Sequence, residues 1–280
     1  MNTFRKSAIL RVSAVLAVLV PFAVPARAAD HAPRSLAPYF TPATAAPKAP
    51  DQDGFLQRWL ILEPISKPNR TNTPFTDSYV RAAFNHEYFP NQFAVIPRDG
   101  DKVKVHVPAP QPAGSGGFPF APPGAATAGL GGGPSPRPPS PPAEPAPAAW
   151  VDEELAWHAL DSAAFNVKLF RFAYGLNKQT YGVIFWAVTV VNSPREMRNV
   201  RLAVGSNAAS MWWLNGKEAV SLFGDRRMVV DDAVSKRLTL TTGSNVIRGA
   251  VINGPGMSDF CVRFIDENGA PIKDLTLSIE

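Results

Sequence analysis

The chain has 280 residues, of which 28 are Lys or Arg and 23 are Asp or Glu, so its formal net charge is +5. Four of the basic residues and none of the acidic ones lie in the first 28 residues, which leaves 24 basic and 23 acidic residues after them. This near balance, without a basic run interleaved with aromatic residues, argues against nucleic acid as a partner. The single cysteine, Cys261, excludes an internal disulfide and is typical of a small buried apolar residue.

The first 28 residues have the three parts of a secretory signal peptide. Arg5, Lys6 and Arg11 precede a short apolar run, and a small-x-small pattern ends at Ala28. The apolar run is too short to span a membrane stably. We therefore expect cleavage after Ala28 and a periplasmic or secreted protein with no membrane insertion once the signal is removed.

Two further segments have the composition of disordered chain. Residues 29–54 are rich in Ala and Pro and are predicted to be an N-terminal tether. Residues 106–150 form a Pro/Gly-rich insertion, with 14 prolines and 8 glycines between positions 108 and 149. Such a composition buries too little apolar surface to offset the entropy of ordering.

The insertion is flanked by two strand-like runs, at 101–105 and 154–160. Because the entropy cost of loop closure grows slowly with loop length, these runs can pair across it. We therefore predict one domain over residues 55–280 that the insertion interrupts. The alternative is that 55–105 forms a small separate module.

The remaining elements are short strands separated by turn signals. Asn215-Gly216 between two such strands is a strong hairpin signal, because both turn residues need a positive φ. One short helix is expected within 76–89. The pattern predicts an all-β fold, an antiparallel β-sandwich or jelly roll. The expected strands cover residues 55–62, 167–174, 181–191, 199–206, 210–215, 217–223, 235–241, 245–252, 259–266 and 273–279.

Hydrolytic machinery is not evident in the sequence. There is no Gly-x-Ser-x-Gly elbow and no metal-ligand spacing of His or Cys. His31 and His106 fall in or beside the low-complexity tracts, which leaves His86 and His158, and a packed or solvent-facing role is favoured for His158. Glycosidase carboxylates come from distant strands, so a pair among the acidic residues stays open. The candidates for such a pair are Glu87, Asp225, Asp231, Asp232 and Asp266.

Residues 224–232, with the sequence GDRRMVVDD, concentrate charge in one loop. Arg offers a planar fork to hydroxyls or carboxylates and Asp accepts from hydroxyls, so the loop could contact a sugar. A loop that neutralises its own charges is the favoured alternative.

Two motifs resemble those of galactose-binding-like β-sandwich domains, the carbohydrate-binding modules found in or beside glycoside hydrolases and acetylxylan-esterase-type proteins. They are a hydrophobic trio before an Asn-Gly turn, Trp212–Gly216, and a Leu-x-x-Gly-x-Asn pattern, Leu240–Asn245. The similarity covers residues 155–280 and, weakly, 55–105. It implies a sandwich with Trp212 and Leu214 inward and with Trp213 as the exposed or ligand-facing ring.

Three functions follow as hypotheses. The first, favoured, is an exported non-catalytic accessory protein that binds carbohydrate, a plant-type polysaccharide or an envelope glycan, or that accompanies an exported glycan-active enzyme. The second is a carbohydrate esterase of the acetylxylan-esterase type or a related hydrolase, and the third is a structural or adaptor protein of the bacterial envelope. No cofactor is expected; the resemblance allows a structural calcium but no ligand set can be named. The candidate ligand-binding residues are Trp213, Asn215, Asp225, Arg226, Arg227, Asp231, Asp232 and Asn253.

Overall fold

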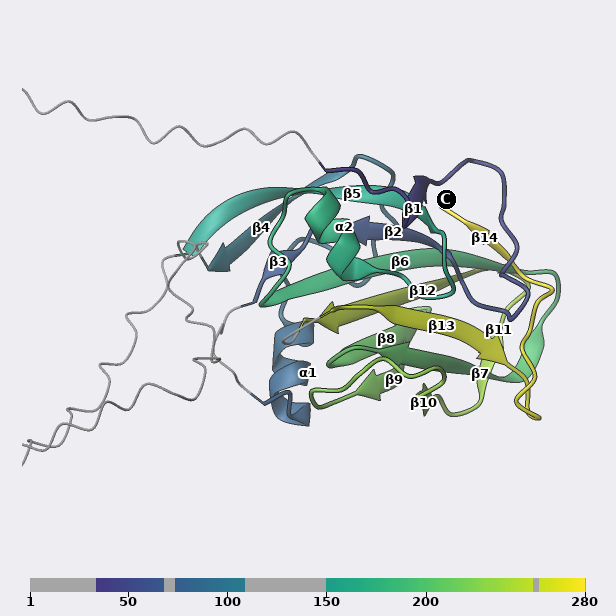
Figure 1. Ribbon diagram of the computed structural model, residues 1–280. Helices are drawn as coiled ribbons and strands as arrows, with labels where there is room; N and C mark the ends of the chain where they lie inside the picture. The colour runs from purple at the N-terminus through teal and green to yellow at the C-terminus, as the bar shows by residue number, and fades with distance from the viewer. Residues whose placement is uncertain (1–33, 68–73, 109–149, 254–256, 280) are drawn as a thin grey trace, which may run out of the picture. The chain divides into compact units, whose positions relative to one another are not determined.

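A computed structural model describes residues 34–67, 74–108, 150–253 and 257–279 (Figure 1). The described chain is nearly all antiparallel β-structure in two sheets, which confirms the predicted all-β sandwich. The larger sheet contains β1 (Phe40–Pro42), β2 (Arg58–Leu62), β3 (Ile65–Ser66), β4 (Lys102–Pro108), β5 (Trp150–Ser162), β6 (Val183–Ser193), β8 (Ser210–Leu214), β9 (Lys217–Leu222), β12 (Gly243–Ile252) and β14 (Thr276–Ser278). The smaller sheet contains β7 (Met197–Ser206), β10 (Ala233–Val234), β11 (Leu238–Leu240) and β13 (Phe260–Ile265).

The strand order of the larger sheet mixes segments that are far apart in the sequence. Its main path runs β1-β5-β2-β6-β12-β8-β9, with β4 also on β5 and with β3 and β14 on β6. In the register, Leu60 of β2 lies between Ala159 of β5 and Val188 of β6. In the smaller sheet β7 pairs with β10, β11 and β13.

Strands from both sides of the predicted insertion belong to the same sheet. β4 pairs with β5 from Lys102 opposite Ala156 to Pro108 opposite Trp150. Residues 106–108 and 150 are therefore strand residues, so the predicted bounds of the insertion were too wide. Residues 109–149 lie outside the described residues, as do the predicted signal peptide and the start of the tether.

The prediction of a disordered tether is wrong for residues 34–54. β1 pairs with β5, and the backbone N–H of Lys48 donates to the carbonyl of Leu277 over 3.0 Å. The Phe40 side chain is buried and packs edge-on against Phe172, with ring centroids 6.3 Å apart. Apolar side chains in this Pro-rich stretch add an edge strand to the sheet, and proline is tolerated at such an edge.

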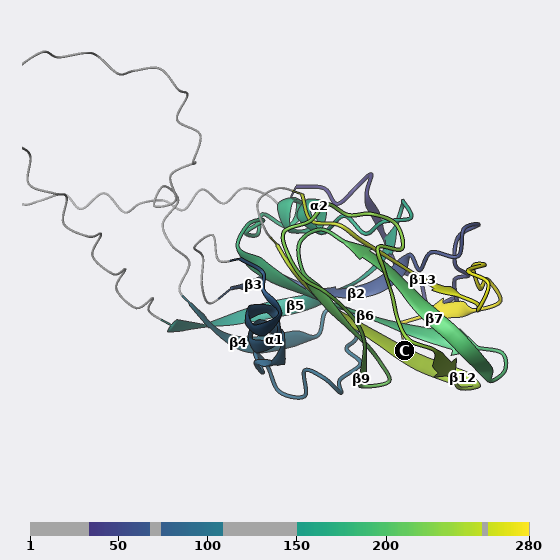
Figure 2. The same cartoon turned by 90° about the horizontal axis from the view of Figure 1, so that it is seen from below.

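Two hydrophobic cores lie on the two faces of the larger sheet. The first fills the space between the two sheets. The second lies on the opposite face under α1 (Asp77–Asn85) and the chain that follows it. Figure 2 shows α1 on one side of the larger sheet and β7 and β13 on the other. The helix falls inside the predicted range 76–89, and the Thr76 side chain caps it by accepting from the backbone N–H of Tyr79.

A second helix, α2 (Leu169–Gly175), replaces the strand predicted over 167–174. Leu169, Phe172 and Ala173 are buried in the first core, at the spacing of one helix face. Only Val167 forms a β-bridge, to Phe260. A short apolar run does not by itself distinguish a strand from a short buried helix, which is why the strand prediction failed.

The tryptophan pair of β8 divides between the two cores. The Trp212 ring is fully buried in the first core, with its centroid 5.9 Å from that of Trp59 and 5.0 Å from that of Phe260. Trp213 points into the second core and is only 7% exposed. The inward orientation of Trp212 is confirmed, whereas the expectation of an exposed ring at Trp213 is wrong, because the sheet is covered on both faces.

The Asn-Gly turn after this pair forms as predicted. Asn215 and Gly216 have φ values of 50° and 78°, and they connect β8 to β9. Positive φ at both central positions is the requirement of a tight hairpin turn.

Candidate functional site

The chain after α1 covers Trp213. Its ring stacks on Trp186, with centroids 5.7 Å apart and planes 17° apart, and Phe93 packs edge-on against both rings. Arg248, opposite Trp213 in the register, donates from its guanidinium to the backbone carbonyls of Phe93 and Val95. Burial lowers the pKa of Arg248 to about 10. Trp213 thus stabilises the fold here and offers no open platform to a ligand.

Asn215 and Asn253 have structural partners. The Asn215 side chain accepts from the backbone N–H of Val246 over 2.8 Å and donates to the side chain of Asn245 over 3.1 Å. Asn253 is buried, and its side-chain amide donates to the carbonyl of Thr180. These contacts place the two asparagines at the ends of β8 and β12, where they bind neighbouring parts of the protein.

Most of the charge in the 224–232 loop is paired. Arg226 and Asp232 form an ion pair of 2.7 Å within the loop, and Asp231 accepts from the guanidinium of Arg263 on β13. The hydrogen bonds that Arg263 donates to the Asp231 carboxylate raise the pKa of Arg263 above its ordinary value. The other two candidates, Asp225 and Arg227, are exposed.

The loop lies against the outer surface of the smaller sheet. A side chain at Gly205 of β7 would place its Cβ within 1.9 Å of the carbonyl oxygen of Val229. Cys261 of the neighbouring strand is buried under the same loop, with its Sγ 3.6 Å from the sulfur of Met228. Burial raises the pKa of the Cys261 thiol to about 11, so the thiol stays protonated, as expected of a structural cysteine.

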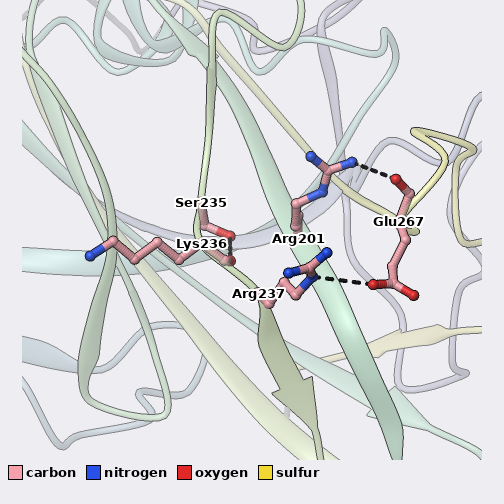
Figure 3. Close-up of a pocket in the computed structure, with 5 residues that line it drawn as sticks. All are labelled: Arg201, Ser235, Lys236, Arg237 and Glu267. Carbon is pink, nitrogen blue, oxygen red and sulfur yellow. Dashed lines mark hydrogen bonds and ion pairs between the residues drawn. The ribbon is translucent and has the colours of Figure 1, made fainter.

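A pocket lies where this loop leads into the next segment of the chain. Its volume is about 490 Å³, and Figure 3 shows its lining. Nε of Arg237 lies 3.1 Å from a carboxylate oxygen of Glu267. The Arg201 guanidinium donates to the backbone carbonyls of Asp266 and Glu267 over 3.2 and 3.1 Å. The lining residues are Arg201, Ser235, Lys236, Arg237 and Glu267.

The smaller sheet positions these side chains by alternation. On β7 the side chains of Leu202 and Val204 enter the core, so Arg201 between Val200 and Leu202 points outward. The hydroxyl of Ser235 accepts from the backbone N–H of Leu202 over 2.9 Å, which fixes the segment beside β7. In Figure 3 Arg201, Arg237 and Glu267 converge, whereas Lys236 extends to the other side.

Sequence reasoning did not single out any residue of this pocket. The available signals were weak: a lone Arg201 inside an apolar strand, two consecutive basic residues at Lys236 and Arg237, and Glu267 in a turn. Asp266, a candidate catalytic carboxylate, instead accepts from the backbone N–H groups of Asn268 and Ala270 in that turn. Three segments that are distant in the sequence supply the lining, so no local motif marks it.

A second polar cluster surrounds Glu63. Its carboxylate lies 2.9 Å from the Lys178 ammonium and 3.5 Å from Nε2 of His158. Burial alone would raise the pKa of Glu63, but the hydrogen bonds from His158, Lys178 and the backbone of Ala156 outweigh it and lower the pKa to about 2. A general acid needs a raised pKa. Glu63 therefore acts as a fixed anion that joins neighbouring segments, and His158 is packed against it and the Phe172 ring.

Two further observations concern metals and membranes. Within the described ranges, no three His, Cys, Asp or Glu side chains come together as a metal-binding group. None of the described helices has the length and apolar character needed to cross a membrane. A structural calcium remains a prediction without a ligand set.

No protein-family model and no curated protein matches the chain. Among solved structures, a PA14 sugar-binding domain from an RTX adhesin is similar over 78% of this chain and 95% of that one, at 9% identity and a TM-score of 0.36. The PA14 domain of the antifreeze protein MpAFP is similar over 34% of this chain and 52% of that one, at 10% identity and a TM-score of 0.28. A β-glucosidase from Kluyveromyces marxianus in complex with glucose matches 42% of this chain and 14% of its own, at 17% identity and a TM-score of 0.29. Likenesses this distant leave the galactose-binding-like assignment a prediction.

Proposed function

We propose that this chain is an exported, non-catalytic accessory protein that binds carbohydrate in the pocket formed by Arg201, Ser235, Lys236, Arg237 and Glu267. The observation that carries the proposal is the chemistry of the lining: five polar or charged side chains around about 490 Å³. Small-molecule pockets of about 300–1,000 Å³ are usually lined mostly by apolar groups. A lining this polar suits a ligand covered with hydroxyls.

The lining supplies both kinds of hydrogen-bonding group that a sugar needs. A hydroxyl both donates and accepts, so it can accept from a guanidinium and donate to a carboxylate. Arg237 and Glu267 already lie within 3.1 Å of each other, which holds a donor and an acceptor side by side before the ligand arrives. Such preorganisation reduces the entropy lost on binding.

The location outside the cytoplasm is part of the proposal. It is supported by the basic, apolar and small-x-small order of the first 28 residues. Mass spectrometry of the protein recovered from the periplasm tests it. A mature N-terminus directly after Ala28 supports export, whereas an intact chain that begins at Met1 contradicts the cleavage.

A glycan array combined with affinity electrophoresis tests the binding function. We expect the wild-type protein to be retarded by at least one polysaccharide gel, and the Arg237→Ala variant to lose that retardation. Arg195→Ala is the matched control, because Arg195 also forms an ion pair with a carboxylate, Asp274, is 65% exposed against 70% for Arg237, and does not line the pocket. Equal retardation of both variants would place binding elsewhere, and no binding by the wild type would reject the function.

An adaptor for an exported glycan-active enzyme is the second candidate. It is favoured by two exposed apolar side chains in the charged loop, Val229 and Val230, and a third just after it, Val234, which are 56%, 41% and 41% exposed. Replacing all three by Ser should abolish capture of a periplasmic enzyme while leaving retardation by polysaccharide intact. Loss of polysaccharide binding in the same variant would instead assign these side chains to the sugar site.

A further inference from the structure

The pocket has an unbalanced charge. Three of its five lining residues are cationic and one is anionic. The anionic residue, Glu267, is paired with Arg237. No described carboxylate lies within ion-pair distance of Arg201 or of Lys236, so two positive charges in one pocket are left without a protein counter-ion.

The other half-buried arginines around the smaller sheet do have counter-ions. Arg226 pairs with Asp232, and Arg263 pairs with Asp231. Arg201 differs from both, because among the described residues only backbone carbonyls accept from its guanidinium. A partly buried charge is costly without a partner, and a ligand anion would supply the missing one.

Arg201 also retains donors for such a ligand. Only one of its terminal nitrogens makes hydrogen bonds, and its Nε is buried without an acceptor among the described residues. An unsatisfied buried donor in a native protein calls for an explanation, such as an absent ligand or water. The planar fork of a guanidinium matches the two oxygens of a carboxylate.

We infer that the carbohydrate bound in this pocket carries a carboxylate, as a uronic acid residue does. Arg201 binds that group, Arg237 and Glu267 bind hydroxyls, and Lys236 adds positive charge from the other side of the pocket. The inference rests on the proposed function. A sulfated sugar would offer the same charge without the planar two-oxygen edge, so it is the competing source of the anion.

The test compares an acid polymer with its neutral ester, which has the same backbone, and with a sulfated polymer. Affinity electrophoresis of the full chain is run in gels of polygalacturonate, of its fully methyl-esterified form, and of a sulfated galactan. We expect retardation by the acid polymer to exceed retardation by its neutral ester roughly tenfold, and to weaken as salt is added, because exposed charges are screened. Stronger retardation by the sulfated galactan than by polygalacturonate would overturn the carboxylate assignment.

Variants separate the pocket from general surface charge. Lys236→Glu should cost roughly tenfold in apparent affinity for polygalacturonate and clearly less for the ester, because it reverses one of the unpaired charges. Lys217→Glu, at an exposed site at the start of β9, is the control that should change neither. Since Arg201 is half-buried, Arg201→Lys is tested beside it: it keeps the charge but lacks the fork, and should still lose affinity for the acid polymer.

The outcomes distinguish the carboxylate inference from the proposed carbohydrate binding on which it rests. Equal binding of the acid polymer and its ester, or equal losses in Lys236→Glu and Lys217→Glu, rejects the carboxylate and leaves carbohydrate binding in place. Binding to neutral glycans alone also rejects the carboxylate and keeps carbohydrate binding. Failure to bind any glycan rejects both.

Discussion

The centre of the larger sheet and the outer surface of the smaller sheet use their side chains in opposite ways. In the larger sheet Trp212 and Trp213 are fully engaged, one in each hydrophobic core, and their rings contact other aromatic rings. On the outer surface Arg201 and Lys236 keep charges that no described side chain neutralises. The tryptophan pair, the most conspicuous pattern in the sequence, therefore stabilises the fold. The side chains available to a ligand are the charged ones on the outer surface of the smaller sheet.

This contrast predicts that the two regions respond to substitution in opposite ways. Changes in the larger sheet should alter the free energy of unfolding. Changes in the pocket should alter ligand binding and leave stability nearly intact. The substitutions that follow test whether effects on stability and effects on binding separate in this way.

The largest effect on stability is expected for Trp213→Ala. Removing a buried aromatic side chain costs about 3–5 kcal/mol, through lost transfer free energy and the cavity left behind. Trp150→Ala is the control, because Trp150 is 45% exposed and surface changes usually stay within about 0.5 kcal/mol. Denaturant unfolding measures both, and a cost below about 1 kcal/mol at Trp213 would mean that its ring is an open platform after all.

A smaller loss is expected for Gly249→Ala. A Cβ at this position would lie 2.3 Å from the Trp212 ring, and overpacking of this kind costs about 1–3 kcal/mol. Because the clash is with the six-membered ring, adding Trp212→Phe should relieve part of it. The double variant should then be less destabilised than the two single variants together. Simple additivity in denaturant unfolding would show that the two sites are not in contact.

The Glu63 cluster predicts a dependence of stability on pH. The pKa of Glu63 is about 2 in the folded protein, against 4.5 for an ordinary glutamate. Its contribution is therefore complete above pH 4.5 and is lost as the pH falls from 4.5 towards 2. Glu63→Gln should cost about 1–2 kcal/mol at pH 7 and flatten the pH profile of the unfolding free energy in that window. An unchanged slope in the variant would show that another group causes the acid sensitivity.

The smallest effect on stability is expected for Arg237→Ala. Arg237 and Glu267 are 70% and 51% exposed, and exposed ion pairs contribute about 0–1 kcal/mol. The variant should therefore unfold within about 1 kcal/mol of wild type while it loses carbohydrate binding. A large loss of stability would make Arg237 a structural residue and would remove it from the binding pocket.

Periodicity and turn chemistry explain why the fold was predictable. Alternating strands, the Asn215-Gly216 turn and the inward orientation of Trp212 all depend on short-range geometry. The second core was not predictable in the same way, because it requires α1 and the chain around Phe93 to cover the far face of the sheet. That cover buries Trp213, and residues 34–54 likewise take their structure from contacts with β5, β14 and α2.

The pocket was beyond prediction for a related reason. Arg201, the Ser235–Arg237 segment and Glu267 come from β7, the segment before β11 and the turn after β13. Only the tertiary fold brings them together, and none of these residues stands out in its own segment of the sequence. The charged 224–232 loop was a visible signal, but its Arg226 and Asp231 pair within the protein.

The most direct test of the proposed site is hydrogen–deuterium exchange with and without a saturating glycan chosen from the array. Binding in the pocket should slow exchange in three segments, 199–203, 233–240 and 264–270, because the ligand stabilises the backbone that carries its contacts. Trp213 and its surroundings should exchange as in the free protein. Protection confined to the β4–β5 hairpin or to α2, with these three segments unchanged, would contradict the assignment of the pocket.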